Sequence, residues 1–367
     1  MAEKIFFTGG GTGGHVYPAL AVFDAVKDRW DGKFAWIGSK KGMERSILDK
    51  YSGSIEYYSI ASGKFRRYFS LKNITDLFLI LTGVFQSIAI LKRERPVLLF
   101  SKGGFVSVPP VIAAKLLGIP AVTHESDFDP GLATKINSRL VRRIYVSYQE
   151  TAGFFNPALR DITKVTGNPV RPDIHTGRRD SGLGYFGFSG KKPILLILGG
   201  SQGSREINSL IAGSLCRLLP VFDIIHQGGD ELVSTQKRGE GYFPAAFLGD
   251  EYPHAVAVSD IVFARSGAGT LWEISALGKP LLLLPLYSAS RGDQVRNAEY
   301  FRKRGAAEVL EPNPSPEKVT GVLLKLIQDK EHMSHMSQAS RAIGGAEAAL
   351  LIARDCLTIA GKGDIEQ

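Results

Sequence analysis

Glycine-rich turns that follow apolar runs are the residues in this sequence whose type and spacing could do chemistry. Residues 9–14 read Gly-Gly-Gly-Thr-Gly-Gly, directly after the run Lys4–Thr8, and His15 follows them. Glycines let the backbone approach a ligand closely, and a helix that begins there leaves N–H groups for an anion. The turn has neither the usual dinucleotide fingerprint nor the Gly-Lys-Ser/Thr ending of a P-loop. His15 has an ordinary pKa suited to proton transfer, although it could instead cap or pack the helix.

Three further turns of this kind follow apolar runs. They lie at Ser101–Pro109, at Leu196–Arg205 and at Arg265–Glu273. Glu273 falls on the first turns of an expected helix, where it could accept hydrogen bonds from the vicinal hydroxyls of a sugar. Its other interpretation is an acid favoured near a helix N-terminus. Four such turns, each at the carboxyl end of an expected strand, predict a ligand held between two domains.

The elements that must position these turns alternate between short β-rich runs and longer helical stretches. Several runs are continuously apolar, as in parallel strands covered on both faces, and 367 residues suffice for two domains. We expect an α/β protein with two Rossmann-like, doubly wound domains that meet near residues 166–169. The expected strands are Lys4–Thr8, Phe34–Gly38, Ile55–Ile60, Val97–Ser101, Ala121–Glu125, Ile144–Tyr148, Ile194–Gly199, Asp223–Gln227, Ala246–Leu248, Ile261–Ala264, Leu281–Pro285 and Ala307–Leu310.

The charge of the chain is unevenly distributed. Residues 1–167 contain 23 Lys and Arg against 14 Asp and Glu, so they carry the whole net charge of +9. This asymmetry indicates an anionic partner, a nucleic acid or an acidic membrane surface, unless the basic surface is simply solvated. The composition, 44% hydrophobic and 22% charged, excludes disordered and fibrous proteins. Cys216 and Cys356 are too few for a disulfide framework or a four-cysteine zinc site, and a cytoplasmic location is expected because no signal peptide is visible.

Six motifs recur in order along the chain, at residues 10–15, 103–107, 124–125, 167–171, 199–203 and 265–268. Together they closely resemble one bacterial enzyme family. The family adds N-acetylglucosamine to undecaprenyl-pyrophosphoryl-N-acetylmuramoyl-pentapeptide (lipid I), which gives lipid II of peptidoglycan synthesis. The resemblance extends from about residue 4 to about residue 355, and the first motif, the fifth and the Asn-Pro-Val-Arg segment are its specific parts.

The resemblance implies a GT-B fold and a division of labour between two domains. Residues 1–167 would form the acceptor-binding, membrane-facing domain, and residues 168–344 would bind the UDP-sugar. Residues 345–367 would form a C-terminal helix and tail that pack back on the first domain. The implied partners are UDP-N-acetylglucosamine, undecaprenyl-linked lipid I and the anionic inner leaflet, with no nucleic acid and no cofactor. The implied location is the cytoplasmic side of the cell membrane, as a peripheral protein.

The family's binding residues transfer to this sequence motif by motif. In the second domain, Arg171 and Ser201 would contact the nucleotide and its diphosphate, and Leu248 would lie where backbone groups contact uracil. Phosphate and ribose would lie along the next helix, with Glu273 on the ribose hydroxyls, and Gln294 would face the sugar. The remaining implied residues are Ala268, Gly269, Thr270, Leu271 and Trp272 for the donor, Thr12, Gly13 and Gly14 for the sugar and diphosphate, and Gly103 and Gly104, with Gly13 and Gly14, for acceptor phosphates.

The implied reaction is an inverting displacement that needs a general base. His15 is the first candidate, with Glu125 and Asp127 as competitors. Asp127 stands where the family often has Asn, which replaces an amide with an acceptor-only carboxylate. Residues 127–129 also spell the Asp-X-Asp of metal-dependent sugar transferases, but helix N-termini and basic groups can stabilise the leaving diphosphate instead, so we expect no metal.

An apolar stretch in the basic half suggests how the chain meets a membrane. Residues 77–91 are uncharged, but 15 residues fall short of the roughly 20 that span a bilayer. We expect a core-packed helix, part of whose apolar face rests on anionic lipid between basic clusters at residues 64–67 and 92–95.

Other functions fit parts of the sequence. A GT-B relative with another lipid acceptor and a UDP-N-acetylglucosamine epimerase share the fold and donor. A nucleic-acid-binding module would explain the basic half, but the basic stretches lack a stacking-aromatic platform.

Overall fold

The computed structural model describes residues 3–51, 53–63, 72–200, 203–287 and 292–362. The chain divides into two compact units: unit 1 is Met1–Arg171 with Ala346–Gln367, and unit 2 is Pro172–Gly345. The sequence places the boundary at residues 167 and 168, a few residues earlier. Each unit is built on one parallel sheet between helices, so the prediction of two doubly wound, Rossmann-like domains is confirmed.

Unit 1 contains a seven-stranded sheet in the order β3-β2-β1-β4-β5-β6-β7, with every pair parallel. Its strands are β1 (Lys4–Thr8), β2 (Lys33–Ser39), β3 (Ile55–Ile60), β4 (Leu98–Ser101), β5 (Ala121–Glu125), β6 (Arg143–Val146) and β7 (Thr163–Val165). Its helices are α1 (Gly13–Lys27), α2 (Met43–Leu48), α3 (Lys72–Glu94), α4 (Val108–Leu116), α5 (Leu132–Asn137) and α15 (Ala348–Ile359).

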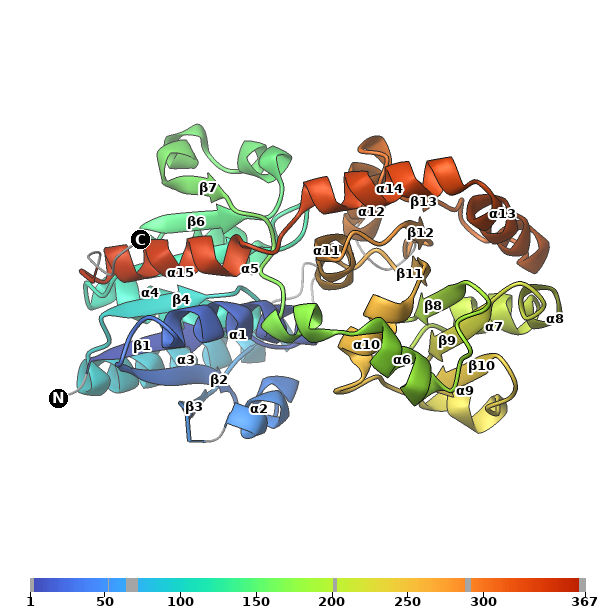
Figure 1. The fold of residues 1–367 in the computed structure, drawn as a ribbon. Coiled ribbons are helices and arrows are strands. Elements are labelled where there is room, and N and C mark those ends of the chain that lie inside the picture. Colours follow the sequence, from blue (N-terminus) through green and yellow to red (C-terminus); the bar gives the residue numbers. More distant parts are fainter. Residues whose placement is uncertain (1–2, 52, 64–71, 201–202, 288–291, 363–367) are drawn as a thin grey trace. The chain divides into compact units, whose positions relative to one another are not determined.

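The C-terminal helix α15 belongs to unit 1, where it packs against α1 (Figure 1). Its Asp355 is held by three groups of β6 and β7. The Tyr145 hydroxyl donates to Asp355 Oδ2 at 2.7 Å, Lys164 Nζ lies 2.7 Å from Oδ1, and Arg143 Nε lies 3.1 Å from Oδ2. Burial alone would raise the pKa of the Asp355 carboxyl, but these hydrogen bonds and positive charges outweigh it and leave the pKa below its ordinary value. The carboxylate therefore fastens the last helix to the sheet.

Helix α3 presents two different faces. Gly83, Ser87 and Leu91 are buried, and a Cβ at Gly83 would lie 2.3 Å from the Ala61 carbonyl oxygen, so this face packs closely on unit 1. The rest of its surface carries exposed apolar side chains: Leu77, Phe78, Leu79, Leu81 and Phe85. The helix is longer than the uncharged run, and its segment Thr75–Glu94 is long and apolar enough to cross a membrane by length and composition alone.

Unit 2 contains a six-stranded parallel sheet in the order β10-β9-β8-β11-β12-β13. Its strands are β8 (Ile194–Leu198), β9 (Asp223–Gln227), β10 (Tyr242–Ala245), β11 (Ile261–Ala264), β12 (Leu281–Leu283) and β13 (Ala307–Val309). Its helices are α6 (Arg179–Phe186), α7 (Arg205–Ala212), α8 (Leu215–Leu218), α9 (Asp230–Thr235), α10 (Tyr252–Val258), α11 (Ala268–Ala276), α12 (Asp293–Lys303), α13 (Pro316–Gln328) and α14 (Lys330–Ile343).

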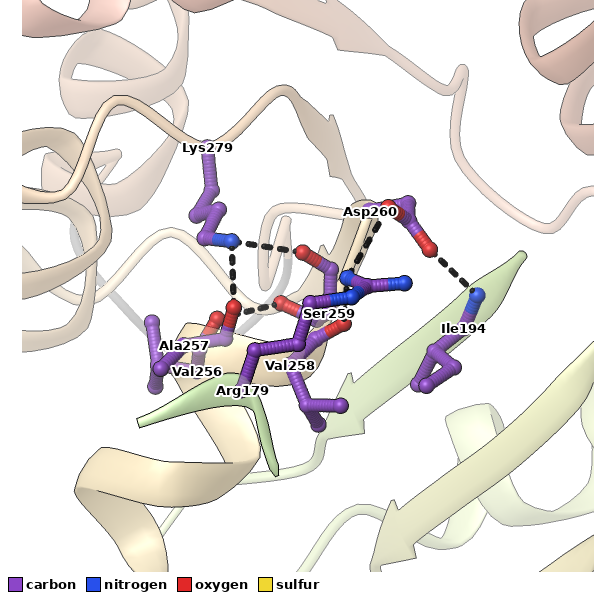
Figure 2. Close-up of polar contacts among 8 residues, drawn as sticks. All are labelled: Arg179, Ile194, Val256, Ala257, Val258, Ser259, Asp260 and Lys279. Atoms are coloured by element: carbon purple, nitrogen blue, oxygen red, sulfur yellow. Dashed lines mark hydrogen bonds and ion pairs between the residues drawn. The ribbon is translucent and has the colours of Figure 1, made fainter. Parts of the chain in front are cut away.

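Two cations from distant parts of unit 2 cap the carboxyl end of α10 (Figure 2). Lys279 Nζ donates to the carbonyl oxygens of Ala257 at 2.9 Å and Ser259 at 2.7 Å. Arg179 Nη1 donates to the carbonyl oxygen of Val258 at 2.8 Å. The last carbonyls of a helix have no intrahelical partner and carry partial negative charge, so these side chains satisfy them. Burial lowers the pKa of Lys279 to about 8, although the charge of Asp260 opposes the shift.

Two strand predictions were wrong in detail. The strand expected at Ala246–Leu248 lies just before that segment, as β10 (Tyr242–Ala245), and β7 was not expected. Both are edge strands: β7 is only three residues, Thr-Lys-Val, and β10 contains a proline, which argues against a strand. Pro244 lies within β10, which an edge strand tolerates because one of its sides needs no backbone donor.

Replacing Asp355 with Asn should destabilise unit 1 in a pH-dependent manner. The folded pKa of Asp355 is depressed, so its stabilisation is present above the ordinary pKa near 4 and is lost as pH falls through the folded value. We expect Asp355→Asn to lower the unfolding free energy by about 1 to 3 kcal/mol at pH 7, and the difference from the unmodified chain to shrink below about pH 4. Urea titration followed by tryptophan fluorescence measures it, in a Trp272→Phe background so that only Trp30 and Trp36 of unit 1 report.

Asp161→Asn, an exposed acid of the same unit, serves as the matched control and should change little. Equal losses in the two variants at pH 7, or a loss at Asp355 that is constant down to pH 3, would contradict the role of the ion cluster.

Candidate active site

The glycine turns lie at the two points where the order of the strands reverses. In unit 1, β1 and β4 are neighbours at the centre of the sheet, and the chain leaves them in opposite directions. In unit 2, β8 and β11 occupy the equivalent position. Ligands of open α/β sheets bind outside the carboxyl ends of the strands at this switch point. All four turns follow one of these four strands.

The first turn is held by a buried carboxylate that the sequence did not single out. Glu44 of α2 is fully buried; its Oε2 accepts from the Gly11 N–H at 3.3 Å, and its Oε1 accepts from the Ser39 N–H at 2.8 Å. The indole N–H of Trp36 donates to the Gly9 carbonyl at 3.2 Å. The turn is therefore braced by side chains, and the first residues of α1, beginning at Gly13, are the part left to present their N–H groups.

His15 lies on the first turn of α1 and is half-buried. Its Nδ1 is 3.3 Å from the carbonyl oxygen of Lys102. A carbonyl can only accept, so Nδ1 carries the proton and the lone pair of the neutral ring is on Nε2. Burial lowers the pKa of His15 to about 4, helped by the charge of Lys102 and opposed by that of Glu125. The imidazole is thus neutral at physiological pH and has a free basic nitrogen.

The second turn of unit 1 packs directly against the first. A Cβ at Gly104 would lie 2.5 Å from the Gly10 carbonyl oxygen and 3.2 Å from His15 Cδ2, and Gly104 has a φ of +78°. Only glycine satisfies both conditions. Gly103 and Gly104 therefore lie beside His15, as residues that share one site must.

The acids expected beside His15 differ in what their side chains do. Glu125 is 4% exposed, and its two oxygens accept from the backbone N–H groups of Asp127 and Gly131, each at 3.0 Å. This carboxylate holds its own loop. Asp127 is the next acid along, and its charge acts on Lys102. Among the described residues, no three His, Cys, Asp or Glu side chains are grouped as metal ligands would be.

Unit 2 contains a cavity of about 470 Å³ at its switch point. The turn after β8, the turn after β11 and the start of α12 all line it, so three distant segments meet there. Gln294 and Thr270 are the sequence-predicted residues among those that line the cavity. The lining residues are Leu198, Gly199, Gly200, Gly203, Ser204, Arg205, Glu206, Arg265, Gly267, Thr270, Leu286 and Gln294.

Arg205, Glu206 and Arg265 of that cavity were missed as site residues. Arg265 donates to Ser204 Oγ at 2.9 Å, to Glu206 Oε2 at 2.6 Å and to the Leu284 carbonyl at 3.0 Å, so it ties the β11 turn to the start of α7. Arg205 is exposed at the rim and pairs with Glu231 at 2.7 Å. The position of Arg205 directly after the glycine turn was the sequence signal that could have identified it as a site residue.

The predicted residues of α11 divide by burial. The helix begins at Ala268 without a side-chain cap, so its first N–H groups are available to an anion. Leu271 and Trp272, by contrast, are buried, and Trp272 packs edge-on to Phe301 with ring centroids 6.1 Å apart. The Leu271 N–H donates to the Gly267 carbonyl at 3.1 Å, so the N–H groups at the start of α11 that can reach an anion belong to the residues before Leu271.

The remaining predicted residues lie at separate places. The Leu248 N–H donates to Gln227 Oε1 at 2.9 Å, and Glu273 Oε2 accepts from the Tyr252 hydroxyl at 3.1 Å. Arg171 ends unit 1, with its guanidinium 5.7 Å from the ring centroid of Tyr17. Ser201 lies outside the described residues.

Comparison with known proteins matches both units. Residues 5–146 match the glycosyltransferase family 28 N-terminal domain, and residues 194–353 match the family's C-terminal domain. A protein of Treponema denticola is 43% identical over 95% of this chain and 96% of its own length. One of Geobacillus kaustophilus is 40% identical over 97% and 99%. Both are described as UDP-N-acetylglucosamine–N-acetylmuramyl-(pentapeptide) pyrophosphoryl-undecaprenol N-acetylglucosamine transferases.

Solved structures share the fold. A crystal structure of Acinetobacter baumannii MurG superposes with a TM-score of 0.75 at 23% identity, over 97% of this chain and 99% of that one. A Neisseria meningitidis UDP-GlcNAc 2-epimerase bound to UDP-GlcNAc gives 0.69 at 15%, over 97% and 100%. At these identities the likeness concerns the fold alone, which is that of GT-B glycosyltransferases. Since the family domains and the sequence relatives together cover nearly the whole length, the chain belongs to glycosyltransferase family 28 and, within it, to the UDP-N-acetylglucosamine–N-acetylmuramyl-(pentapeptide) pyrophosphoryl-undecaprenol N-acetylglucosamine transferases.

Proposed function

We propose that the chain transfers N-acetylglucosamine from UDP-N-acetylglucosamine to the C4 hydroxyl of the muramoyl sugar of lipid I, with inversion, and so forms lipid II in peptidoglycan synthesis. The observation that carries the proposal is the likeness of 40–43% identity, over nearly the whole chain, to relatives described as this transferase.

Unit 2 has the features that a nucleotide-sugar site needs. Its cavity is lined by glycine backbone, by two arginines and by Thr270 near the uncapped start of α11. Free N–H groups at a helix start and nearby guanidinium groups attract a diphosphate and stabilise it as it leaves. Gln294 lines the same cavity, where it would contact the hydroxyls of the sugar. Glu273, which is oriented by Tyr252, would accept from the ribose hydroxyls.

Unit 1 supplies the acceptor side and the base. The turns at Gly13–Gly14 and Gly103–Gly104 would hold the acceptor's phosphates next to His15. The C4 oxygen of the acceptor forms a bond to the anomeric carbon as the bond from that carbon to UDP breaks, and UDP leaves with the electron pair. The hydroxyl proton passes to His15 Nε2, the nitrogen left unprotonated by the Lys102 carbonyl. Asp127 is the alternative base; Glu125 already holds two backbone N–H groups.

Helix α3 supports docking on a membrane, which the lipid tail of the acceptor requires. Phe78 and Phe85 are 67% and 70% exposed and lie seven residues apart, hence on one side of the helix. Exposed apolar side chains of this size, next to the basic end at Lys92 and Arg93, suit an anionic lipid surface. The second expected basic cluster, residues 64–67, lies outside the described residues. We infer a peripheral location on the cytoplasmic side of the cell membrane.

An assay of donor turnover tests the reaction. With UDP-N-acetylglucosamine and a lipid I analogue, we expect UDP release that depends on the acceptor, together with a disaccharide product. Release of UDP without acceptor, or conversion of the sugar to its 2-epimer, would favour the epimerase alternative, whose fold this chain shares.

Substitution of His15 tests the base. His15→Gln keeps a group that can donate to the Lys102 carbonyl but removes the basic nitrogen. We expect kcat to fall by about 10²- to 10⁴-fold with little change in the KM for the donor. Asp127→Asn, measured alongside, separates the two candidates: a larger loss in that variant, with His15→Gln near normal, would transfer the role to Asp127.

The membrane surface can be tested without the reaction. The double variant Phe78→Ser, Phe85→Ser should lower binding to vesicles containing phosphatidylglycerol by at least about tenfold, because each buried Phe is worth about 1.5 to 3 kcal/mol. Turnover of a water-soluble acceptor should not change. Phe154→Ser, at an exposed aromatic residue elsewhere on unit 1, is the control. Undiminished vesicle binding of the double variant in a flotation assay would exclude this face.

A further inference from the structure

Lys102 is a buried lysine in the second glycine turn of unit 1, and the base of its side chain lies against the first turn, where a Cβ at Gly9 would be 3.1 Å from Lys102 Cβ. It follows β4, and its side chain is only 1% exposed, although lysine is almost never fully buried unless it is paired. Its Nζ donates to Ser126 Oγ at 2.7 Å, and Ser126 Oγ donates to Asn168 Oδ1. A fully buried charge of this kind is costly to the fold, so a role in the site is the explanation to test.

The main chain of the same residue sets the position of His15. The Lys102 N–H donates to the Thr8 carbonyl at 2.8 Å, which fixes the residue to the end of β1. Its carbonyl accepts from His15 Nδ1 at 3.3 Å. Lys102 thus contacts the imidazole through its backbone while its side chain runs to the loop after β5. Lys102 therefore links His15 to the loop after β5.

The charged groups that act on His15 are Lys102, which follows β4, and Glu125 of β5. Glu125 holds two backbone N–H groups of its own loop, and Asp127 lies in that loop. Lys102 is the cation that faces these acids: the charges of Glu125 and Asp127 favour its protonated form, and burial disfavours it, with a resulting pKa of about 8. The ammonium is therefore charged at neutral pH.

We propose that Lys102 is a positioning residue for the transfer reaction: its carbonyl fixes the tautomer of His15, and its buried ammonium, bonded to Ser126 in the loop after β5, opposes protonation of the imidazole where Glu125 favours it. The role in transfer rests on the proposed function, whereas the electrostatic effect does not. The lowered pKa of His15, caused first by burial and then by the charge of Lys102, agrees with the geometry.

Lys102→Met tests the proposal because methionine keeps an unbranched stem and removes the charge. The ring of His15 is followed by NMR titration of the full chain labelled in histidine, with His15→Gln to identify its signal. We expect the midpoint of His15 to rise by about one to two pH units in the variant. The acidic limb of the pH profile of kcat/KM for the acceptor should rise by the same amount, which a merely structural loss of rate would not produce.

Lys279→Met is the matched control, since Lys279 is a half-buried lysine that also has a pKa of about 8 but belongs to unit 2 (Figure 2). It should leave the His15 midpoint unchanged. An unchanged midpoint in folded Lys102→Met, or an equal shift in Lys279→Met, would overturn the proposal. If Lys102→Met does not fold, Lys102→Gln, which can still donate to Ser126, is titrated instead and judged by the same outcomes.

The titration also separates this inference from the proposed function. A chain that makes no lipid II but shows the shift would disprove the transfer reaction and retain the electrostatic role. A chain that makes lipid II without the shift would support the transfer reaction and disprove the electrostatic role.

Discussion

The structure depends on the reversal of strand order at the centre of two parallel sheets. At that point two neighbouring strands send their chains to opposite faces, so no connection crosses the space beyond their carboxyl ends. Glycine is needed there because the turns after neighbouring strands come close together, as Gly104 and the Gly10 carbonyl do. Helices α1 and α11 begin in two of these turns without a side-chain cap, so their first N–H groups are unpaired at that edge of the sheet. Each unit therefore has an anion-attracting edge before any side chain contributes.

Side chains then set the chemistry of each edge, and they do so differently. In unit 2, Arg265 holds two segments of the cavity together, and Arg205 stands at its rim. In unit 1, the charged side chains are buried. Glu44, Glu125 and Lys102 form hydrogen bonds to the turns or to neighbouring loops. The cavity of unit 2 is thus lined by two arginines, each paired with a glutamate, whereas the glycine turns of unit 1 surround a neutral imidazole.

The sequence could predict the fold and the turns because both follow from local patterns. Apolar runs mark strands that are covered on both faces, and glycine clusters after them mark the carboxyl edge. Strand β7 escaped because it is only three residues long and two of them are polar, and β10 escaped because Pro244 argues against a strand. Glu44 and Lys102 escaped for a different reason: a charged residue on a short helix or after a strand looks solvated until the packing of other elements buries it. The sequence also could not decide between Glu125 and His15 as the general base. The hydrogen bonds that occupy Glu125 depend on the conformation of its loop, which residue spacing does not predict.

The attachment of α15 to unit 1 has a consequence for how the chain is made. Ile352 and Cys356 lie in the same core cluster as Phe7 and Val22 of β1 and α1, yet all of unit 2 separates them in the sequence. During synthesis, the first sheet leaves the ribosome long before the helix that completes its core. Unit 2, which is continuous, can reach its final structure while unit 1 still exposes apolar surface. The domain that is made first is therefore the last to be finished, and the newly made chain is most prone to aggregation through its N-terminal half.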